Sequence, residues 1–439
     1  MNQKEALDII KMGYNVFLTG SAGSGKTFLL CEYISYLKKN NIDCAVTAST
    51  GIAATHLDGR TIHSWSGIGT SSELTKELID KILGNKKIKK RISNSHILII
   101  DEISMLSADT LDTVDKVYQT IRKNTEPFGG VQVILSGDFL QLPPVSRLDD
   151  DFDTKFAFES EVWKKMSIKI CYISEQYRHE DGEYYNILSK IRTNTADIKI
   201  RDTLLSRQNK TIKDVEKPTK LFSHNLDVNE LNDLELAQIK NEPTEYIMKK
   251  SGNKWLVKSL CKGCLAPEKL VLKKDAIVMF VKNNFNEGYV NGTLGRVVGF
   301  NTDGHPEVQT KNGIITAVPA SWTIEENHKI VATVTQIPLR LAWAITIHKS
   351  QGMTLDAAVM NLGKTFEYGM GYVALSRLKS LKGLSLQAIN DIALKVDPSL
   401  VNQDKTFIEQ SNTDKSKILS INKSSIRKEQ KKILKLYTK

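Results

Sequence analysis

Residues 20–27 read GSAGSGKT, one residue after the short apolar run 16–18. The stretch matches the phosphate-loop pattern GxxxxGK[ST], and the residues that follow, FLLCEYISYLKK, place apolar side chains on one face of a helix. Glycines let backbone N–H groups wrap phosphates, and a helix N-terminus adds partial positive charge. The order strand, loop, helix therefore predicts a nucleotide site. The residues expected to line it are Gly20, Ser21, Ala22, Gly23, Ser24, Gly25, Lys26 and Thr27.

Residues 97–102, ILIIDE, supply the second part of this site. Lys26 is expected to reach the β- and γ-phosphates of ATP, and Thr27 to bind Mg²⁺ together with Asp101. Glu102 would then orient or deprotonate the attacking water. Taken alone, the acid pair would read as a cap on the next helix, but beside a phosphate loop it indicates a catalytic pair.

Further continuous apolar runs, at 44–49 and 131–135, alternate with helical segments. Buried strands alternating with helices predict an α/β fold with a parallel sheet covered on both faces. The strand in VILSGDFLQLPPV (133–145) ends in polar residues, and such strand ends converge on the ligand crevice of parallel sheets. Gln141 could therefore contact the γ-phosphate; the alternative is a glutamine in a turn.

Two stretches interrupt the α/β pattern. The first, about 67–95, is polar and lysine-rich and predicts a small insertion. The second, about 270–335, has short alternating strands with Asn-Gly hairpin signals at 291–292 and 312–313, which predict an inserted antiparallel β-barrel. The predicted parts are a first domain over 1–165, a second over 166–401 and a basic tail over 402–439.

The composition is that of a globular protein, with 41% hydrophobic and 25% charged residues. The net charge is +11, and the tail holds 10 Lys or Arg against 4 Asp or Glu, which indicates either a solvated, frayed end or a contact with a polyanion. No segment approaches the roughly 20 apolar residues of a membrane helix, and the N-terminus lacks a signal core. A cytoplasmic location without membrane contact is expected. Five scattered cysteines argue against a disulfide framework.

The order of the short motifs carries a family resemblance. The segments NQKEA, GSAGSGKT, VTASTGIAA, GRTIHSW, DEISM, GDFLQLPPV, EQYRH, AITIHKSQG and YVALSR resemble, in sequence and order, the motifs of superfamily 1B helicases. Residues 111–132, LDTVDKVYQTIRKNTEPFGGVQ, resemble the signature of the petite-integration-frequency DNA helicases, which are related to RecD. The resemblance spans about residues 3–390.

The resemblance implies two RecA-like P-loop NTPase domains that bind ATP and Mg²⁺, with a wedge insertion in the first and an SH3-like β-barrel in the second. It implies an ATP-dependent helicase that moves 5′→3′ on single-stranded DNA and unwinds duplex or structured DNA. The expected partners are single-stranded DNA and DNA forks, with four-stranded guanine DNA and RNA–DNA hybrids as further candidates, and a monomer is expected. Two alternatives remain open: an ATP-switched nucleic-acid clamp and a RecD-like subunit of a repair complex.

Site residues follow from the resemblance position by position. Gln3 matches the residue that reads the adenine edge, and Gly352 falls in the nucleotide site. Arg178 and Arg377, which alone would read as surface or salt-bridge residues, match the two arginine fingers. The residues in motifs that touch DNA, or link it to the nucleotide, are Thr50, His63, His348, Lys349 and Ser350.

The chain departs from the family pattern at Met370, where a glutamine is usual, and at Gln119, where the signature has an arginine. Trp65 and Trp343 flank two of the motifs. Each could be a stacking surface for a base or a core residue.

Overall fold

The computed structural model describes residues 1–69, 74–144, 156–178, 181–212, 218–222, 226–284, 286–326 and 329–438. The chain forms two compact units. The first contains Met1–Tyr177, Ile324–Ile330 and Asn402–Lys439, and the second contains Arg178–Thr323 and Val331–Val401. None of the helices within these described ranges is both long and apolar enough to cross a membrane.

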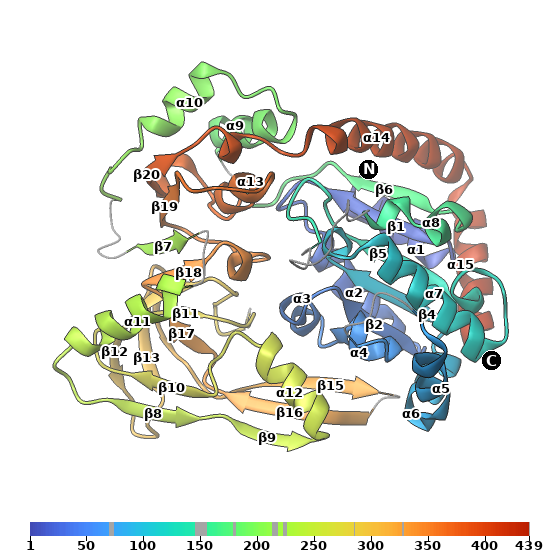
Figure 1. The fold of residues 1–439 in the computed structure, drawn as a ribbon, viewed down its shortest axis with the longest axis horizontal. Helices are drawn as coiled ribbons and strands as arrows, with labels where there is room; N and C mark the ends of the chain where they lie inside the picture. The colour runs from blue at the N-terminus through green and yellow to red at the C-terminus, as the bar shows by residue number, and fades with distance from the viewer. Residues whose placement is uncertain are drawn as a thin grey trace. The chain divides into compact units, whose positions relative to one another are not determined.

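The first unit is built on a six-stranded parallel sheet in the order β3-β2-β4-β5-β1-β6 (Figure 1). All residues of β1, β4 and β5 are buried, which explains their uninterrupted apolar sequences. The predicted parallel α/β fold is confirmed. The strands are β1 (Val16–Gly20), β2 (Cys44–Ala48), β3 (Arg60–Thr61), β4 (Ile97–Asp101), β5 (Gln132–Ser136) and β6 (Lys169–Ile173).

Helices cover both faces of this sheet. One face packs against α1, α2 and α15 in a single apolar core, and the other presents Phe17 to aromatic rings of α8 and α14. The helices are α1 (Gln3–Lys11), α2 (Lys26–Lys39), α3 (Gly51–His56), α4 (Ile62–Ser66), α5 (Lys76–Gly84), α6 (Lys86–Asn94), α7 (Ala108–Arg122), α8 (Glu161–Lys165) and α15 (Lys423–Tyr437). Helix α14 (Pro398–Leu419) belongs to this unit from Asn402 onward.

Two predicted boundaries are wrong. The predicted second domain begins at residue 166, yet β6 pairs with β1 along its whole length and completes the first sheet. The supposed tail, 402–439, is not a frayed end: its helices, red in Figure 1, bury Phe407, Ile418 and Ile426 in the first unit. Sequence reasoning missed this packing because lysines on the exposed faces dominate the composition of the segment.

The predicted lysine-rich insertion contains α5 and α6, although residues 70–73 of it lie outside the described ranges. Helix α7, which carries most of the family signature, forms hydrogen bonds from its last turn to the end of α6. The Arg122 guanidinium donates to the backbone oxygens of Ser93, at 2.9 Å, and Ser95, at 3.1 Å. The signature therefore caps the free carbonyls at the end of α6.

The second unit contains a four-stranded parallel sheet in the order β18-β7-β19-β20. These strands are β7 (Thr219–Phe222), β18 (Ala344–Thr346), β19 (Ala358–Leu362) and β20 (Leu384–Ile389). The helices of the unit are α9 (Gly182–Arg192), α10 (Ile198–Leu205), α11 (Leu226–Gln238), α12 (Lys254–Gly263) and α13 (Met370–Leu375).

A large antiparallel region is inserted between α11 and β18. Its main sheet has the order β14-β13-β12-β11-β17, and two smaller sheets pair β10 with β8 and join β15, β16 and β9. The strands are β8 (Thr244–Ile247), β9 (Lys249–Gly252), β10 (Lys269–Leu272), β11 (Ile277–Phe280), β12 (Leu294–Phe300), β13 (Pro306–Thr310), β14 (Gly313–Thr316), β15 (Ala320–Glu326), β16 (Lys329–Gln336) and β17 (Leu339–Leu341). The insertion is thus longer than the predicted 270–335, and its identity as an SH3-like barrel stays a prediction.

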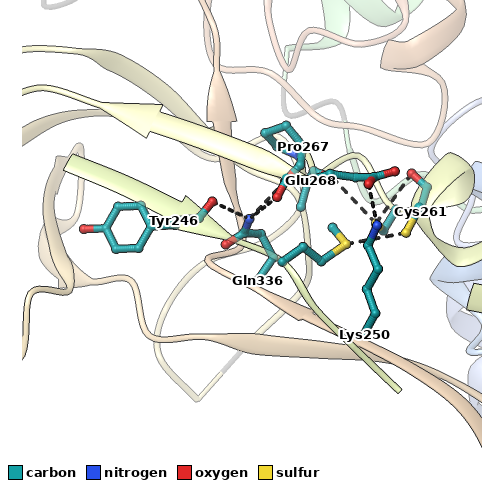
Figure 2. Close-up of polar contacts among 9 residues, drawn as sticks. Tyr246, Lys250, Cys261, Pro267, Glu268 and Gln336 are labelled. Carbon is teal, nitrogen blue, oxygen red and sulfur yellow. Dashed lines mark hydrogen bonds and ion pairs between the residues drawn. The ribbon is translucent and has the colours of Figure 1, made fainter. Parts of the chain in front are cut away.

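Figure 2 shows how the smaller sheets are tied together. The Gln336 side chain donates through Nε2 to the backbone oxygens of Tyr246, at 3.1 Å, and Pro267, at 3.0 Å. Nearby, Lys250 forms an ion pair with Glu268. These bonds join the two smaller sheets through segments that are far apart in sequence.

Candidate nucleotide and nucleic-acid site

The phosphate loop joins β1 to α2 in the first unit and contains close backbone approaches that only glycine permits. Gly20 has φ +146°, and a Cβ there would lie 2.5 Å from the Ile173 oxygen. The hydroxyl oxygen of Ser24 is buried and has no hydrogen-bond partner among the described residues. Lys26 donates through Nζ to the oxygens of Gly20, at 2.8 Å, and Ser21, at 3.2 Å. The Lys26 ammonium group is therefore bonded to backbone carbonyls of the phosphate loop itself.

Gln3 and Tyr177 lie against the outer side of this loop. Gln3 Nε2 donates to the oxygens of Ser24 and Gly25, both at 3.3 Å, and a Cβ on Gly25 would lie 3.4 Å from a ring carbon of Tyr177. The Tyr177 side chain is 61% exposed, and its backbone N–H donates to Gly23 at 3.1 Å. Gln3 is thus next to the loop, and its role at the adenine edge stays a prediction. Sequence reasoning missed Tyr177, although it immediately precedes the predicted finger Arg178.

The carboxylates stand at the end of β4. Asp101 is 4% exposed, and burial raises the pKa of its carboxyl, opposed in part by hydrogen bonding and the Lys26 charge. Glu102 has a left-handed backbone (φ 52°, ψ 46°), and Ser49 Oγ donates to its carbonyl at 2.7 Å. Non-glycine residues in this region cost energy and concentrate at functional sites. The conformation turns Glu102 away from the direction of the strand.

Gln141 is buried beyond the end of β5. Its Nε2 donates to Asp138 Oδ2 at 3.0 Å, and its backbone N–H donates to the Asp138 carbonyl at the same distance. Asp138 is itself 1% exposed. The Gln141 side chain is therefore fixed by a hydrogen bond next to the strand ends. Its role as a sensor of the γ-phosphate stays a prediction.

The first unit offers a donor set suited to Mg²⁺. A hard cation prefers carboxylate and hydroxyl oxygens. Asp101 at the end of β4 and Thr27 in the first turn of α2 supply one of each, and the unpartnered Ser24 hydroxyl lies in the same loop. A bound cation would also favour the ionised form of Asp101, which burial alone disfavours. The residues thus fit the predicted metal.

Two predicted DNA-motif residues of the first unit stand at short helices. Thr50 caps α3 by accepting a hydrogen bond from Ala53 at 3.2 Å, and His63 lies in α4. Trp65 of the same helix is 6% exposed and donates from its indole to the Tyr118 hydroxyl at 2.7 Å. Trp65 is therefore a core residue, as is Trp343 at 4% exposure.

In the second unit, the turn His348–Ser350 follows β18. Burial lowers the pKa of His348, and burial together with the Arg340 charge lowers the pKa of Lys349. Ser350 is buried and donates to Ile347 at 2.7 Å, so its hydroxyl points inward. Gly352 closes the turn with φ +77°, a conformation that suits glycine.

The two predicted arginine fingers lie together beside Ser376. Arg178 Nη1 donates to the Ser376 carbonyl at 3.0 Å, and Arg377 Nη2 donates to the Ser376 hydroxyl at 2.9 Å. Arg377 is 2% exposed and also donates to Val373 at 2.9 Å and, in a long 3.5 Å contact, to Ser350. The side chain thus joins α13 to the turn that carries His348–Ser350.

The departures from the family pattern lie within packed structure. Met370 is fully buried at the start of α13. Gln119 donates to Asp115 Oδ2 at 2.9 Å, inside the signature helix. Neither residue touches the phosphate loop in the described contacts.

The two parallel sheets and the phosphate loop define a P-loop nucleoside triphosphatase with RecA-like units. Family models match residues 1–197 as "PIF1-like helicase" and residues 256–300 as "DNA helicase Pif1, 2B domain". The chain is 43% identical over 471 residues to the ATP-dependent DNA helicase Pif1 of Psychrobacter sp., covering 94% of this chain and 71% of that one. It belongs to the PIF1-like helicase family.

Two further proteins support this assignment. The human ATP-dependent DNA helicase PIF1 is 34% identical over 405 residues, which cover 91% of this chain and 62% of that one. The crystal structure of Pif1 helicase from Bacteroides in complex with ADP-AlF3 and ssDNA has a TM-score of 0.61 and 30% identity, covering 93% of this chain and 97% of that one. The family resemblance stated from the motifs is confirmed.

Proposed function

We propose that this protein is an ATP-dependent DNA helicase that translocates 5′→3′ on single-stranded DNA and unwinds duplex or structured DNA. The Psychrobacter and human relatives carry the name ATP-dependent DNA helicase, and the Bacteroides relative was crystallised with both a nucleotide complex and single-stranded DNA. The direction of movement rests on the family resemblance. Forked DNA, four-stranded guanine DNA and RNA–DNA hybrids are the proposed substrates.

The observation that carries the proposal is the set of bonds around Ser376 in the second unit. Arg178 and Arg377 both bond to Ser376, and Arg377 also reaches Ser350 of the His348–Ser350 turn. A side chain that moves toward a γ-phosphate must first leave these partners. Nucleotide binding would therefore alter the support of the proposed DNA-contacting turn, because Arg377 holds it.

The residues of the first unit take the remaining roles. The phosphate loop and Lys26 bind the phosphates, Gln3 orients the adenine, and Tyr177 offers its exposed ring to the base. Glu102 positions the attacking water and accepts its proton. Mg²⁺, when held by Thr27 and Asp101, supplies the positive charge that offsets the phosphate oxygens. Thr50 and His63 contact the strand, and the α5–α6 insertion acts as the wedge.

A monomer acting in the cytoplasm, in DNA repair and recombination, completes the proposal. These points derive from the sequence and its resemblance.

Strand separation on tailed duplexes tests the function directly. Duplexes with a 5′ tail, a 3′ tail or no tail are incubated with protein and ATP, and separation is followed by gel. Separation of only the 5′-tailed duplex is expected. Lys26→Ala is expected to lower ATP hydrolysis by about 10²–10³, since it removes one donor from the developing charge, while DNA binding persists.

The alternatives give different outcomes. DNA-stimulated ATP hydrolysis without strand separation would identify an ATP-switched clamp. A chain without either activity until a partner is added would identify a RecD-like subunit. Parental hydrolysis by Lys26→Ala would contradict the nucleotide site itself.

A further inference from the structure

A cavity of about 490 Å³ lies in the second unit, between α11, β10 and β17. Leu236, Leu270 and Leu341 form part of its wall, and Arg340 and Asp233 add charged groups. The volume lies within the range of small-ligand sites. None of the residues assigned above to the nucleotide or to DNA lines it, so its role is unassigned.

Arg340 is the unusual member of this wall. It stands on β17, and its Nε is buried without a hydrogen-bond partner. No hydrogen bond or ion pair joins its side chain to any residue in the described part of the chain, the Asp233 carboxylate included. Burial lowers the pKa of the Arg340 guanidinium, with no opposing effect from a nearby acid. A buried N–H group without an acceptor destabilises the folded protein unless a ligand accepts its hydrogen bond.

The two lysines that line the cavity differ from Arg340, because both have partners. Lys269 pairs with Glu245 at 2.8 Å, and Lys273 donates to the Ile239 carbonyl at 2.7 Å. The charge that Arg340 does feel is Lys349, whose pKa it helps to lower. The charges of two partly buried cations thus interact, and no ion pair joins either of them to an acid in the described residues. This arrangement favours an anionic ligand that neutralises both.

We propose that Arg340 binds a backbone phosphate of the nucleic-acid strand and that the leucine-walled cavity receives the sugar or base attached to it. This inference rests on the proposed function, since it extends the strand from the His348–Ser350 turn toward the inserted antiparallel region. A guanidinium presents five N–H donors in a planar fork that suits phosphate oxygens, and leucine side chains suit a sugar or base face. Contacts of this kind position a strand without reading its sequence.

The salt dependence of single-strand binding tests the proposal. Oligo-dT affinity is measured by fluorescence anisotropy across a series of NaCl concentrations, without ATP, for the parent, Arg340→Gln and Arg296→Gln. The control arginine also lies in the inserted region but is exposed and pairs with Asp275 at 3.6 Å, so its loss changes the net charge equally. Arg340→Gln is expected to reduce the slope of log K against log[salt] by about 0.7, the share of one phosphate contact. Arg296→Gln should keep the parental slope.

Thermal unfolding without DNA separates a binding role from a structural one. Arg340→Gln removes an unpaired charge, so its Tm should equal or exceed that of the parent. Arg340→Lys, which keeps a charge but lacks the planar fork, should recover the slope and bind more weakly than the parent. An unchanged slope with a lowered Tm would show that Arg340 is structural and overturn the proposal.

Inorganic phosphate distinguishes the strand from a free anion. If millimolar phosphate raises the Tm of the parent but not of Arg340→Gln, and the slope is unchanged, the cavity binds a free anion and the strand assignment is wrong. If the parent binds no oligo-dT at all, the proposed function itself fails. If the parent, Arg340→Gln and Arg296→Gln all show the same salt slope, the proposed function stands and only the role of Arg340 is contradicted.

Discussion

The phosphate loop of the first unit and the arginine pair of the second differ in how their polar groups are satisfied. The loop surrounds a cradle with an unpartnered Ser24 hydroxyl, and Tyr177 beside it is exposed. The guanidinium of Arg377, in contrast, is 2% exposed and donates to backbone and hydroxyl oxygens of its own unit. One region keeps a buried hydroxyl without a partner, whereas the other bonds its guanidinium to groups of its own unit.

The contrast separates binding from turnover. The groups proposed for the phosphates, the adenine and the metal belong to the first unit, and only Gly352 of the proposed nucleotide site belongs to the second. In the proposed mechanism, Arg377 must exchange several of its present hydrogen bonds for bonds to a phosphate before it can assist hydrolysis. The nucleotide can shift the equilibrium between the two arrangements of this arginine, bonded within its own unit or bonded to a phosphate. The size of that shift is set by the difference in affinity of the nucleotide for the two arrangements.

The largest expected effect comes from Arg377→Ala. Turnover on single-stranded DNA should fall by about 10³–10⁵, the usual contribution of an arginine finger, while the ATP Kd stays within a few-fold of the parent. Hydrolysis is measured under single-turnover conditions, and binding with a fluorescent nucleotide. Normal turnover by Arg377→Ala would contradict the comparison between the two units, because Arg377 would then not act as an arginine finger.

Arg207→Ala is the matched control. Arg207 also lies in the second unit and donates to two backbone oxygens, those of Leu384 at 3.0 Å and Lys382 at 2.9 Å. Its loss should lower stability much as the loss of Arg377 does, and leave turnover intact. Equal losses of turnover in both variants would show that anchoring the backbone, and not a finger, explains the effect.

The next effect concerns the scaffold beneath the phosphate loop. Phe407 of α14 is 4% exposed and lies 5.1 Å, ring to ring, from Phe17 of β1, the strand that leads into the loop. Phe407→Ala should cost about 3–5 kcal/mol of unfolding free energy through the cavity it leaves. Ile408→Ala, at a neighbouring position 37% exposed, should cost much less. Urea denaturation of both variants checks this difference.

Similar losses in the two variants would mean that α14 is not part of the core of the first unit. The same packing changes how the basic segment is tested. Removing residues from Asn402 onward would expose the apolar groups that α14 and α15 cover, so a truncation would report folding and not DNA contact.

The parts of the fold that could be predicted are those whose signal is local. Three continuous apolar runs predicted β2, β4 and β5, and GSAGSGKT predicted the turn from β1 into α2. The errors involve contacts that form only in three dimensions. Residues 169–173 resemble any short strand, and only their pairing with β1 assigns them to the first sheet.

The candidate site divides in the same way. The spacing of the phosphate loop indicated Lys26, and the acids at the end of a buried strand indicated Asp101 only when they were considered together with that loop. Arg178 and Arg377 needed the order of nine motifs. Arg340 belongs to no motif, and only its buried, unpartnered Nε draws attention to it.

The smallest of these effects is expected at Tyr177, the last residue of the first unit before Arg178 begins the second. If its exposed ring stacks on the base, Tyr177→Ala should weaken ATP binding on the order of tenfold, since stacking is lost and the phosphate contacts remain. Tyr177→Phe keeps the ring and removes only the hydroxyl, which donates to Glu175 at 3.0 Å, so its affinity should stay near the parental value. Equal weakening in both variants would assign the effect to the hydroxyl and its bond to Glu175. Because Glu175 also accepts from the backbone N–H of Gln3 at 3.1 Å, that result would make Tyr177 a positioning residue for Gln3. Either result keeps these base-side contacts within the first unit.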